Sequence, residues 1–364
     1  MSENKVTCLH DKHVALGALM SPFGGFDMPI QYKGIVEEHN AVRNAVGVFD
    51  VSHMGEVRIT GPEAQKFVNY IFTNDITKME VGGIQYGMML YPTGGTVDDL
   101  LVYTMGENDY FLVINAANID KDVAWINEQA AKFDVKVDNQ SESYGQIAIQ
   151  GPEAEKTMLE VLSLDCSDLT FYTFKCVDYN GDKMIVSRTG YTGEDGFEVY
   201  ASHDTIRDMW DMLIQAGVQP CGLGCRDTLR FEVGLPLYGD ELTQDITPIM
   251  AGFGFFVKLD KDDFIGKEVC AQQKAEGAPK KLVGLELHDK AIPRHGYEVC
   301  NENEEPVGYV TTGYRGISVD KSIAVALVDA AYSKLGTALK VHIRKKYFDA
   351  TVVKKKFHDK SYKK

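Results

Sequence analysis

The chain has 364 residues, more than one compact core usually holds, so we expect two or three domains. A hydrophobic fraction of 44% is ordinary for a globular protein, and no apolar run approaches the roughly 20 residues needed to cross a bilayer. The net charge of -15 repels nucleic acid, and the N-terminus resembles neither a signal nor a transit peptide. We therefore expect a cytoplasmic protein that binds neither membranes nor nucleic acids.

The cysteines and histidines form no recognisable metal-binding pattern. The seven cysteines include no CxxC pair, which is typical of reduced thiols in a reducing compartment. Cys221 and Cys225 are four residues apart and could share a helix face, but no second pair of ligands accompanies them. We therefore interpret them as structural thiols and predict no metal site.

In chain order, the first informative feature is a segment that recurs about 90 residues later. Residues 57–64, Val-Arg-Ile-Thr-Gly-Pro-Glu-Ala, are echoed by residues 147–154, Ile-Ala-Ile-Gln-Gly-Pro-Glu-Ala. Each copy predicts a strand that ends at Gly-Pro and an amphipathic helix after it, with Pro62 and Pro152 as the first helical residues. The echo favours two related α+β subdomains, although a chance recurrence of a common turn would look the same.

Apolar periodicity and turn residues place the remaining elements. After the first copy we expect three strands and a helix, at residues 86–91, 97–103, 110–115 and 119–132. After the second copy we expect three strands and two helices, at residues 175–177, 184–188, 197–201, 205–216 and 226–233. Beyond a composition shift near residues 260–280, short runs predict a small barrel or sandwich, at residues 282–287, 308–312, 323–327, 339–343 and 350–354.

The stretch from Lys334 to Lys364 is rich in lysine and arginine, unlike the rest of this acidic chain. A charge run of this kind usually solvates a surface. It can also form a docking patch for an acidic protein partner. The sequence leaves both interpretations open.

Asp98 and Asp99 lead directly into the apolar run Leu100–Val102 and are the first candidates for chemistry. Neighbouring residues of a strand point to opposite faces, so the two carboxylates should not share a proton. A carboxylate that enters a buried strand is costly unless it meets a partner or a ligand. Capping of the preceding turn by both side chains explains the pair equally well.

The segment from Thr189 to Glu198 is rich in glycine, which permits tight turns of the backbone close to a ligand. Tyr191 could stack on a flat ring, and Glu198 could accept hydrogen bonds from ring N–H groups. A plain hairpin loop is the alternative. A nucleotide site is not expected, because neither a P-loop nor a dinucleotide motif is present.

Arg226 lies in the first turn of a predicted helix, where a cation is unfavourable against the helix dipole. A residue placed against its local preference is a candidate for a functional partner such as a carboxylate. A salt bridge with Asp227, Asp240 or Glu241 is the structural alternative.

Several segments in fixed order carry a resemblance to a known family: Phe23–Pro29, Val48–Glu56, Gly94–Leu100, Val113–Ile119, Val186–Glu198 and Gly222–Asp227. Together they resemble the aminomethyltransferase family of glycine cleavage T-proteins. The similarity extends from about residue 8 to the Val352-Val-Lys-Lys segment, which is essentially the whole chain.

The resemblance implies an α+β fold, a three-domain cloverleaf with two related α+β subdomains and a small C-terminal β-barrel around a central folate pocket. A discontinuous folate-binding domain would comprise residues 1–52 and 140–255, and residues 53–139 would form the second α+β domain, which carries Asp99. Residues 256–280 would be a helical linker and residues 281–364 the barrel domain.

The same resemblance implies the reaction. The aminomethyl carbon held on the lipoyl group of a partner, lipoylated H-protein, would pass to tetrahydrofolate, with release of ammonia and formation of 5,10-methylenetetrahydrofolate. Tetrahydrofolate would be the acceptor substrate, and no metal would be needed. The family's catalytic aspartate is the second of the pair, hence Asp99, and its folate contacts carry over onto Tyr86, Tyr103, Asn115, Tyr191, Glu198 and Arg226.

Some relatives have an arginine near the C-terminus that reaches the folate, whereas this tail has none, so Tyr362 or a neighbouring lysine would substitute. Two other functions stay open. A folate-binding relative associated with iron–sulfur cluster maintenance would generally lack the Asp-Asp motif and carry a cysteine-containing signature, which is absent here. A folate-dependent demethylase would take its carbon from a free small molecule.

Overall fold

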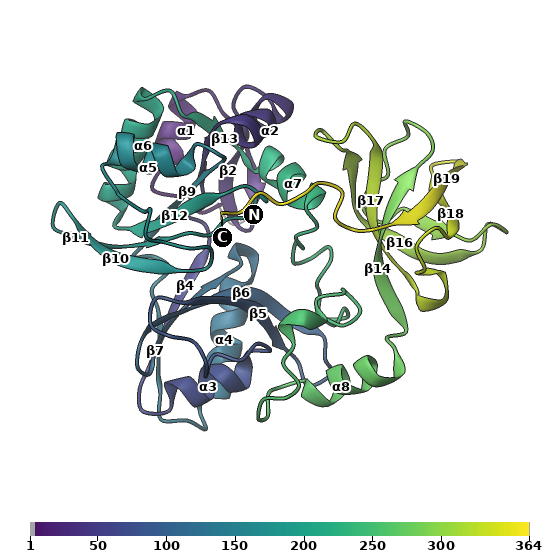
Figure 1. The fold of residues 1–364 in the computed structure, drawn as a ribbon, viewed down its shortest axis with the longest axis horizontal. Helices are drawn as coiled ribbons and strands as arrows, with labels where there is room; N and C mark the ends of the chain where they lie inside the picture. The colour runs from purple at the N-terminus through teal and green to yellow at the C-terminus, as the bar shows by residue number, and fades with distance from the viewer. Residues whose placement is uncertain (1–3, 364) are drawn as a thin grey trace.

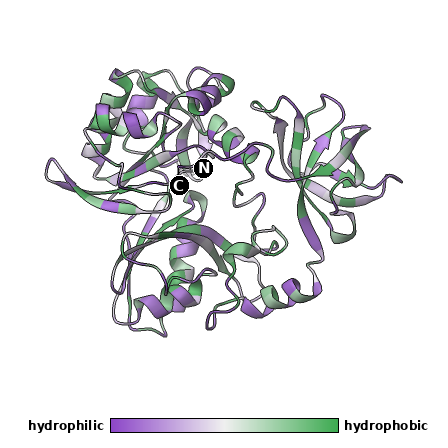
Figure 2. Ribbon diagram, in the orientation of Figure 1, coloured by the Kyte–Doolittle hydropathy of each residue, from purple (hydrophilic) through white to green (hydrophobic). Residues whose placement is uncertain are grey.

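The computed structural model describes residues 4–363, which form three lobes arranged in a ring (Figure 1). Two lobes are built on mixed or antiparallel sheets covered by helices, and the third is a closed barrel. Hydrophobic and hydrophilic residues alternate along the helices, as expected for helices that pack one side against a sheet (Figure 2). No helix within the described residues is long and apolar enough to cross a membrane.

The first lobe contains a six-stranded sheet of order β10-β11-β12-β9-β3-β13. Its strands are β3 (Gly47–Asp50), β9 (Gly145–Gln150), β10 (Phe174–Tyr179), β11 (Asp182–Ser187), β12 (Gly196–Ala201) and β13 (Gln219–Cys221). Its helices are α1 (His10–Ala15), α2 (Ile35–Asn44), α5 (Ala154–Leu162), α6 (His203–Gln215) and α7 (Leu223–Glu232), and the hairpin β1 (Leu19–Phe23) and β2 (Phe26–Gln31) lies beside α7.

The second lobe contains a five-stranded sheet of order β5-β6-β7-β4-β8. Its strands are β4 (Gly55–Thr60), β5 (Ile84–Leu90), β6 (Thr96–Gly106), β7 (Asp109–Ile114) and β8 (Lys136–Asn139). Helices α3 (Ala64–Ile71) and α4 (Ile119–Ala130), the latter preceded by the 3-10 turn η1 (Ala116–Asn118), bury one core with the sheet.

The two sheet lobes share one chain path. In each, a first strand is followed by a helix, three antiparallel strands, a second helix and a last strand that runs antiparallel to the first. Strand β3 is an insertion between the first and last strands of the six-stranded sheet. The echo in the sequence is therefore a structural repeat, and the prediction of two related α+β subdomains is confirmed.

One detail of the repeat was predicted wrongly. Helices α3 and α5 begin at Ala64 and Ala154, two residues after Pro62 and Pro152, and Glu63 and Glu153 precede them as N-caps. The amide of Ala64 donates to the carbonyl of Gly61 at 3.0 Å, so the Gly-Pro pair forms a turn before the helix.

The sheets of the two lobes meet at equivalent edges. The amide of Ile84 donates to the carbonyl of Tyr172 at 2.9 Å, and the amide of Phe174 donates to the carbonyl of Gly82 at 2.8 Å. The two contacts mirror each other across the junction. An aromatic core that includes Tyr103, Phe111 and Tyr200 fills the space behind it.

The barrel lobe closes in the order β14-β17-β16-β15-β18-β19, which confirms the predicted C-terminal barrel. Its strands are β14 (Lys280–Leu287), β15 (Glu298–Cys300), β16 (Pro306–Arg315), β17 (Ser322–Asp329), β18 (Ala338–Ile343) and β19 (Lys346–Val353), with the 3-10 turn η3 (Ala330–Tyr332) after β17. The 3-10 turn η2 (Gly254–Phe256) and helix α8 (Lys267–Glu276) connect it to the other lobes.

The chain leaves the barrel after β19 and returns to the first lobe (Figure 1). The amides of Phe357 and His358 donate to the carbonyl of Glu232 at 2.8 Å, and the amide of Ser361 donates to that of Gly193 at 2.8 Å. The domain boundaries expected from the sequence stay predictions, and residues 1–3 and 364 of those ranges lie outside the described part of the chain.

Candidate active site

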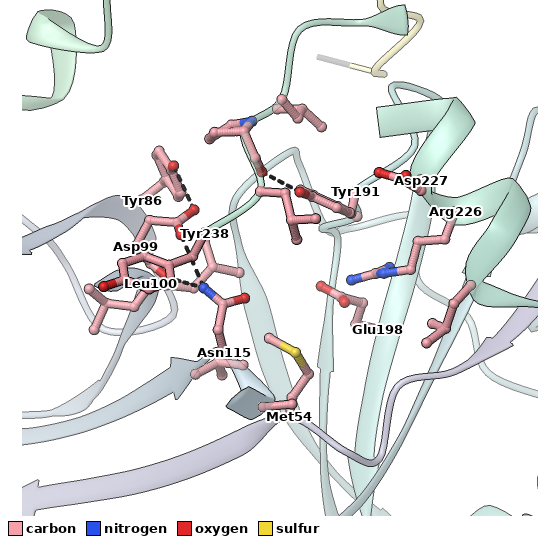
Figure 3. A pocket seen from close by; sticks show the side chains of 18 of the residues that line it. Met54, Tyr86, Asp99, Leu100, Asn115, Tyr191, Glu198, Arg226, Asp227 and Tyr238 are labelled. Atoms are coloured by element: carbon pink, nitrogen blue, oxygen red, sulfur yellow. Dashed lines mark hydrogen bonds between the residues drawn. The ribbon is translucent and has the colours of Figure 1, made fainter. Parts of the chain in front are cut away.

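A cavity of about 590 Å³ lies where the two sheet lobes, α7 and the C-terminal segment come together. It is of the size that binds a small organic ligand. Six of the seven residues named from the sequence line it, namely Tyr86, Asp99, Asn115, Tyr191, Glu198 and Arg226, and the seventh, Tyr103, does not. Figure 3 shows Asp99 with Tyr86 and Asn115 on one side, and Glu198 with Arg226 on the other.

Asp99 is held in one orientation by two side-chain donors. Tyr86 donates from its hydroxyl to Oδ2 at 2.8 Å, and Asn115 donates from Nδ2 to Oδ1 at 3.0 Å. Strand alternation turns Asp98 away from the cavity, where it is fully buried and accepts from Asn118 at 2.7 Å and from the amide of Asn115 at 2.9 Å. Neither carboxylate accepts a hydrogen bond from residues 92–95 in the described structure, so the turn-capping alternative is wrong.

The surroundings of Asp99 disfavour its charge. Burial and, to a smaller extent, the negative charge of Asp98 raise the pKa of Asp99 to about 7, while the hydrogen bonds from Tyr86 and Asn115 act in the opposite direction. A carboxyl group with this pKa can be neutral or ionised near neutrality. Such a value is typical of a group that takes part in catalysis.

Glu198 projects from β12 on the opposite side of the cavity, with 6% of its surface exposed. Thr189 donates to Oε2 at 2.6 Å, and Gln146 donates to Oε1 at 3.2 Å. Burial raises the pKa of Glu198, against the hydrogen bond from Thr189 and the charge of Arg226. Each oxygen retains a lone pair, so the carboxylate can accept further N–H donors from a ligand.

Arg226 lies over Tyr191, with its guanidinium carbon 4.7 Å from the ring centroid. Its Nη1 is buried and has no hydrogen-bond partner among the described residues. The alternative of a structural salt bridge is wrong, because Asp227, Asp240 and Glu241 instead surround Arg230, at 2.7, 3.7 and 2.7 Å. Burial lowers the pKa of Arg226, and an unsatisfied buried donor is costly, so the arrangement fits a ligand acceptor.

Tyr103 lies behind the cavity, although it was expected to contact the ligand. It lies on the same face of β6 as Asp99, but four residues along a strand span about 13 Å. At that distance the six-stranded sheet covers Tyr103. Its hydroxyl donates to Ser187 at 3.1 Å, and Ser187 bonds Thr189 at 2.7 Å. Since Thr189 bonds Glu198, this chain connects Tyr103 to the site, and the Tyr103 hydroxyl also lies 3.0 Å from that of Tyr200, which lines the cavity.

His53 lines the cavity and was not singled out from the sequence, where no partner residue marked it. It is 2% exposed, packs edge-on against Phe23 with centroids 5.7 Å apart, and its Nδ1 has no partner among the described residues. Burial, with a smaller contribution from the charge of Arg226, lowers the pKa of His53 to about 4 against the opposing effect of the Asp50 charge, so the imidazole is neutral at physiological pH.

The C-terminal segment completes the cavity wall. Tyr362 stacks on Phe171 with centroids 4.1 Å apart, and Phe171 stacks on Tyr172 at 4.4 Å, with interplanar angles of 15° and 13°. All three rings line the cavity, together with Lys360. Both candidates for replacing the arginine of some relatives, Tyr362 and a nearby lysine, therefore lie at the cavity.

Glu38, Cys221 and Cys225 form a buried group of possible metal donors within the described residues. The carboxylate of Glu38 already accepts four backbone amides, those of Tyr32, Lys33, Gly34 and Gly222, at 2.6 to 3.1 Å. Burial raises the pKa of Cys225 well above its ordinary value, which disfavours the thiolate. The group therefore fits a structural anchor between α2 and α7 better than a metal centre.

Comparison with known proteins agrees with this geometry. Residues 9–261 match the family profile described as the GCVT N-terminal domain, and residues 280–359 match the glycine cleavage T-protein C-terminal barrel domain. The chain belongs to the glycine cleavage T-protein family. The resemblance noted from the sequence is thereby confirmed.

Similar members of the glycine cleavage T-protein family span the full chain. An aminomethyltransferase of Alkaliphilus oremlandii is 49% identical over 100% of both chains, and one of Bacillus subtilis is 51% identical over 97% of this chain and 99% of its own. The crystal structure of glycine cleavage system aminomethyltransferase T from Bartonella henselae superposes with a TM-score of 0.94 at 30% identity, covering 100% of each chain. The protein is thus a transferase of the aminomethyltransferase class, whose family uses tetrahydrofolate.

Proposed function

We propose that the protein transfers the aminomethyl carbon from lipoylated H-protein to tetrahydrofolate within the glycine cleavage system, releasing ammonia and forming 5,10-methylenetetrahydrofolate. The proposal is carried by one observation: the two sides of the cavity differ in their chemistry. Asp99 lies on one side, and Glu198 with the unsatisfied Arg226 lies on the other.

The wall of Glu198 and Arg226 suits the polar edge of a pterin. Glu198 accepts hydrogen bonds from the ring N–H and amino groups, and Arg226 donates to ring acceptors. Both groups are already buried and oriented by neighbours, so little conformational freedom is lost when the ligand binds. The stacked rings of Tyr172, Phe171 and Tyr362 offer an apolar wall to the rest of the folate.

Asp99 acts on the reacting groups. The reaction joins a folate amine to an electron-poor CH₂ while ammonia leaves, so positive charge develops beside the carboxylate. An ionised Asp99 orients the amine and stabilises that charge. Because its pKa is about 7, it can also accept a proton from the amine during the transfer.

No metal takes part in this proposal, and the lipoyl group belongs to the partner. A cytoplasmic location is proposed as well, because all seven cysteines are free and reduced thiols persist in a reducing compartment.

The decisive experiment varies the carbon donor. With tetrahydrofolate as acceptor, we expect methylenetetrahydrofolate to form from aminomethylated H-protein and not from free methylated amines. The Asp99→Asn protein is assayed in parallel as the control, and its turnover should be strongly reduced if product formation depends on this site. Turnover with a free amine but not with H-protein would replace the proposal by a folate-dependent demethylase.

A further inference from the structure

Asp122 is a fully buried carboxyl group that lies behind Asp99 and that the proposed reaction leaves unused. It projects from the first turn of α4. Lys121 donates to its Oδ1 at 2.7 Å, whereas its Oδ2 is buried and accepts no hydrogen bond from the described residues. A buried oxygen without a partner is costly, so we expect this atom to take part in a hydrogen bond of another kind.

The neighbour of Asp122 is Asp98, with which it is in hydrogen-bonding contact. Asp98 already accepts three N–H groups. Nδ2 of Asn118 and Nδ2 of Asn115 donate to its Oδ1 at 2.7 and 2.8 Å, and the amide of Asn115 donates to its Oδ2 at 2.9 Å. Three donors favour the ionised form of a carboxyl group, and two ionised carboxylates in buried contact repel each other strongly. One proton therefore lies between the two groups, and it belongs to Asp122.

Lys121 does not compensate a second negative charge. Its Nζ is shared between Oδ1 of Asp122 and the carbonyl of Val97. Its side chain is 35% exposed, so solvent screens its charge. A protonated carboxyl group still accepts from Lys121 through its carbonyl oxygen, so this contact fits a neutral Asp122. Burial and, to a smaller extent, the contact with Asp98 raise the pKa of Asp122 well above its ordinary value, against the charge of Lys121.

We propose that Asp122 is a positioning residue for the aminomethyl transfer: as a neutral acid it donates its proton to Asp98 and keeps Asp98 as the anion that orients Asn115. The inference rests on the proposed function, because it takes Asp99 to act on the reacting groups. Nδ2 of Asn115 donates both to Oδ1 of Asp98 at 2.8 Å and to Oδ1 of Asp99 at 3.0 Å. An anion at Asp98 attracts the N–H groups of the Asn115 amide and repels its oxygen, so the donor to Asp99 stays in place.

The shared proton also sets the charge next to Asp99. Asp98 and Asp122 together carry one negative charge, and a second one would raise the pKa of Asp99 further and favour its protonated form near neutrality. Besides Lys121, the titratable groups that face these aspartates are the tyrosines Tyr86, Tyr172, Tyr191 and Tyr238, and Tyr91 lies beside the last of them. Burial raises the pKa of these four tyrosines, so they add no charge near pH 7.

The test compares Asp122→Asn with Asp122→Leu. Asparagine reproduces the neutral acid, because it has an N–H group for Asp98 and a carbonyl oxygen for Lys121, whereas leucine has a similar size and neither group. We expect Asp122→Leu to lower kcat/KM by about tenfold to a hundredfold, and asparagine at the same position to rescue it. Asp120→Asn is the matched control, because Asp120 is an exposed acidic residue of the same helical turn, and it should behave as wild type.

The pH profile separates a neutral Asp122 from an ionised one. The midpoint of kcat/KM near pH 7 should stay in place in Asp122→Asn, because no charge is removed, and should move to lower pH in Asp98→Asn. A midpoint that moves in Asp122→Asn as it does in Asp98→Asn would overturn the proposal. So would a folded Asp122→Leu protein with the kcat/KM of wild type.

Infrared spectroscopy reads the proton without the reaction, at a pH well above 7 where Asp99 is ionised. The difference spectrum between wild type and Asp122→Asn should contain the carbonyl stretch of a protonated carboxyl group. Its absence would overturn the proposal even if Asp122→Leu fails to fold. Presence of this band in a protein that gives no turnover with aminomethylated H-protein would count against the proposed function and not against the shared proton.

Discussion

The two sheet lobes follow the same chain path, yet they present different chemistry to the cavity. The second lobe contributes Asp99, whose pKa is raised to about 7 by burial and by Asp98. The first lobe contributes Glu198 and Arg226, whose opposite charges influence each other's pKa, and the buried Nη1 of Arg226 has no hydrogen-bond partner among the described residues. The repeated fold therefore supplies only a framework. The second lobe forms the wall that carries Asp99, which we call the reacting wall, and the first lobe forms the wall that carries Glu198 and Arg226, which we call the recognition wall.

Asp99→Asn tests the reacting wall and should have the largest effect. We expect turnover to fall by about a hundredfold to ten-thousandfold, because the developing positive charge loses its counter-charge. The Kd for tetrahydrofolate should change little, since asparagine keeps the shape and the contact with Tyr86. Single-turnover kinetics and calorimetry measure the two quantities separately, and a large rise in Kd with unchanged turnover would reverse the assignment of the two walls.

Glu198→Gln tests the recognition wall. The variant loses the charged acceptor for the N–H donors of the ligand. We therefore expect the Kd for tetrahydrofolate to rise by about tenfold to a hundredfold. The rate of the chemical step at saturating folate should stay within a few-fold of wild type. Glu194→Gln is the matched control, because Glu194 is a buried carboxylate in the loop before β12 that pairs with Arg43 at 3.0 Å and does not line the cavity.

The pH dependence sharpens the contrast further. If the ionised form of Asp99 is active, kcat/KM in the wild type should rise through about pH 7. Asp98→Asn removes the negative charge that raises the pKa of Asp99, so the midpoint should move to lower pH. An unchanged midpoint in that variant would show that another group sets the profile.

The stability of the protein should follow the same titration. The pKa of Asp99 in the folded protein is above its ordinary value of 3.8. Between about pH 4 and pH 7 the folded protein therefore keeps a proton on Asp99 that the unfolded chain has released. The contribution of Asp99 to the free energy of unfolding is therefore fully present below about pH 4 and is lost as the pH rises to about 7. Asp99→Asn should raise Tm at pH 8 relative to wild type and have little effect at pH 4, as measured by calorimetry in the absence of folate.

Tyr103→Phe should have the smallest effect, because Tyr103 does not line the cavity and its hydroxyl is connected to the Glu198 carboxylate through Ser187 and Thr189. Loss of one hydroxyl in this chain should weaken folate binding by about twofold to tenfold. The Kd of the variant checks this. A Kd change as large as that of Glu198→Gln would mean that Tyr103 contacts the ligand itself.

Local patterns in the sequence predicted much of this architecture. The Gly-Pro echo predicted the repeat, and alternation of apolar residues placed the strands that carry Asp99 and Glu198. Strand parity separated Asp98 from Asp99 without any tertiary information. The short β15 was not predicted, because three residues carry too little periodicity to be recognised.

What the sequence could not give depends on contacts between distant segments. Only the folded chain shows that Arg230 takes the three acidic partners considered for Arg226. The burial of Tyr103 depends on how the second sheet packs on β6, and the role of Tyr362 as a wall depends on the return of the chain from the barrel. None of these facts has a local signal.

The reciprocal backbone contacts at the junction, from Ile84 to Tyr172 and from Phe174 to Gly82, have the form of a two-fold symmetric interface. A homodimer of one such unit could join in the same way, but every substitution would then appear on both walls. An acidic group introduced for chemistry would be doubled across the site, and so would a cation introduced for recognition. Joining the two units in one chain removes that constraint, so each half can change by itself while the junction is kept.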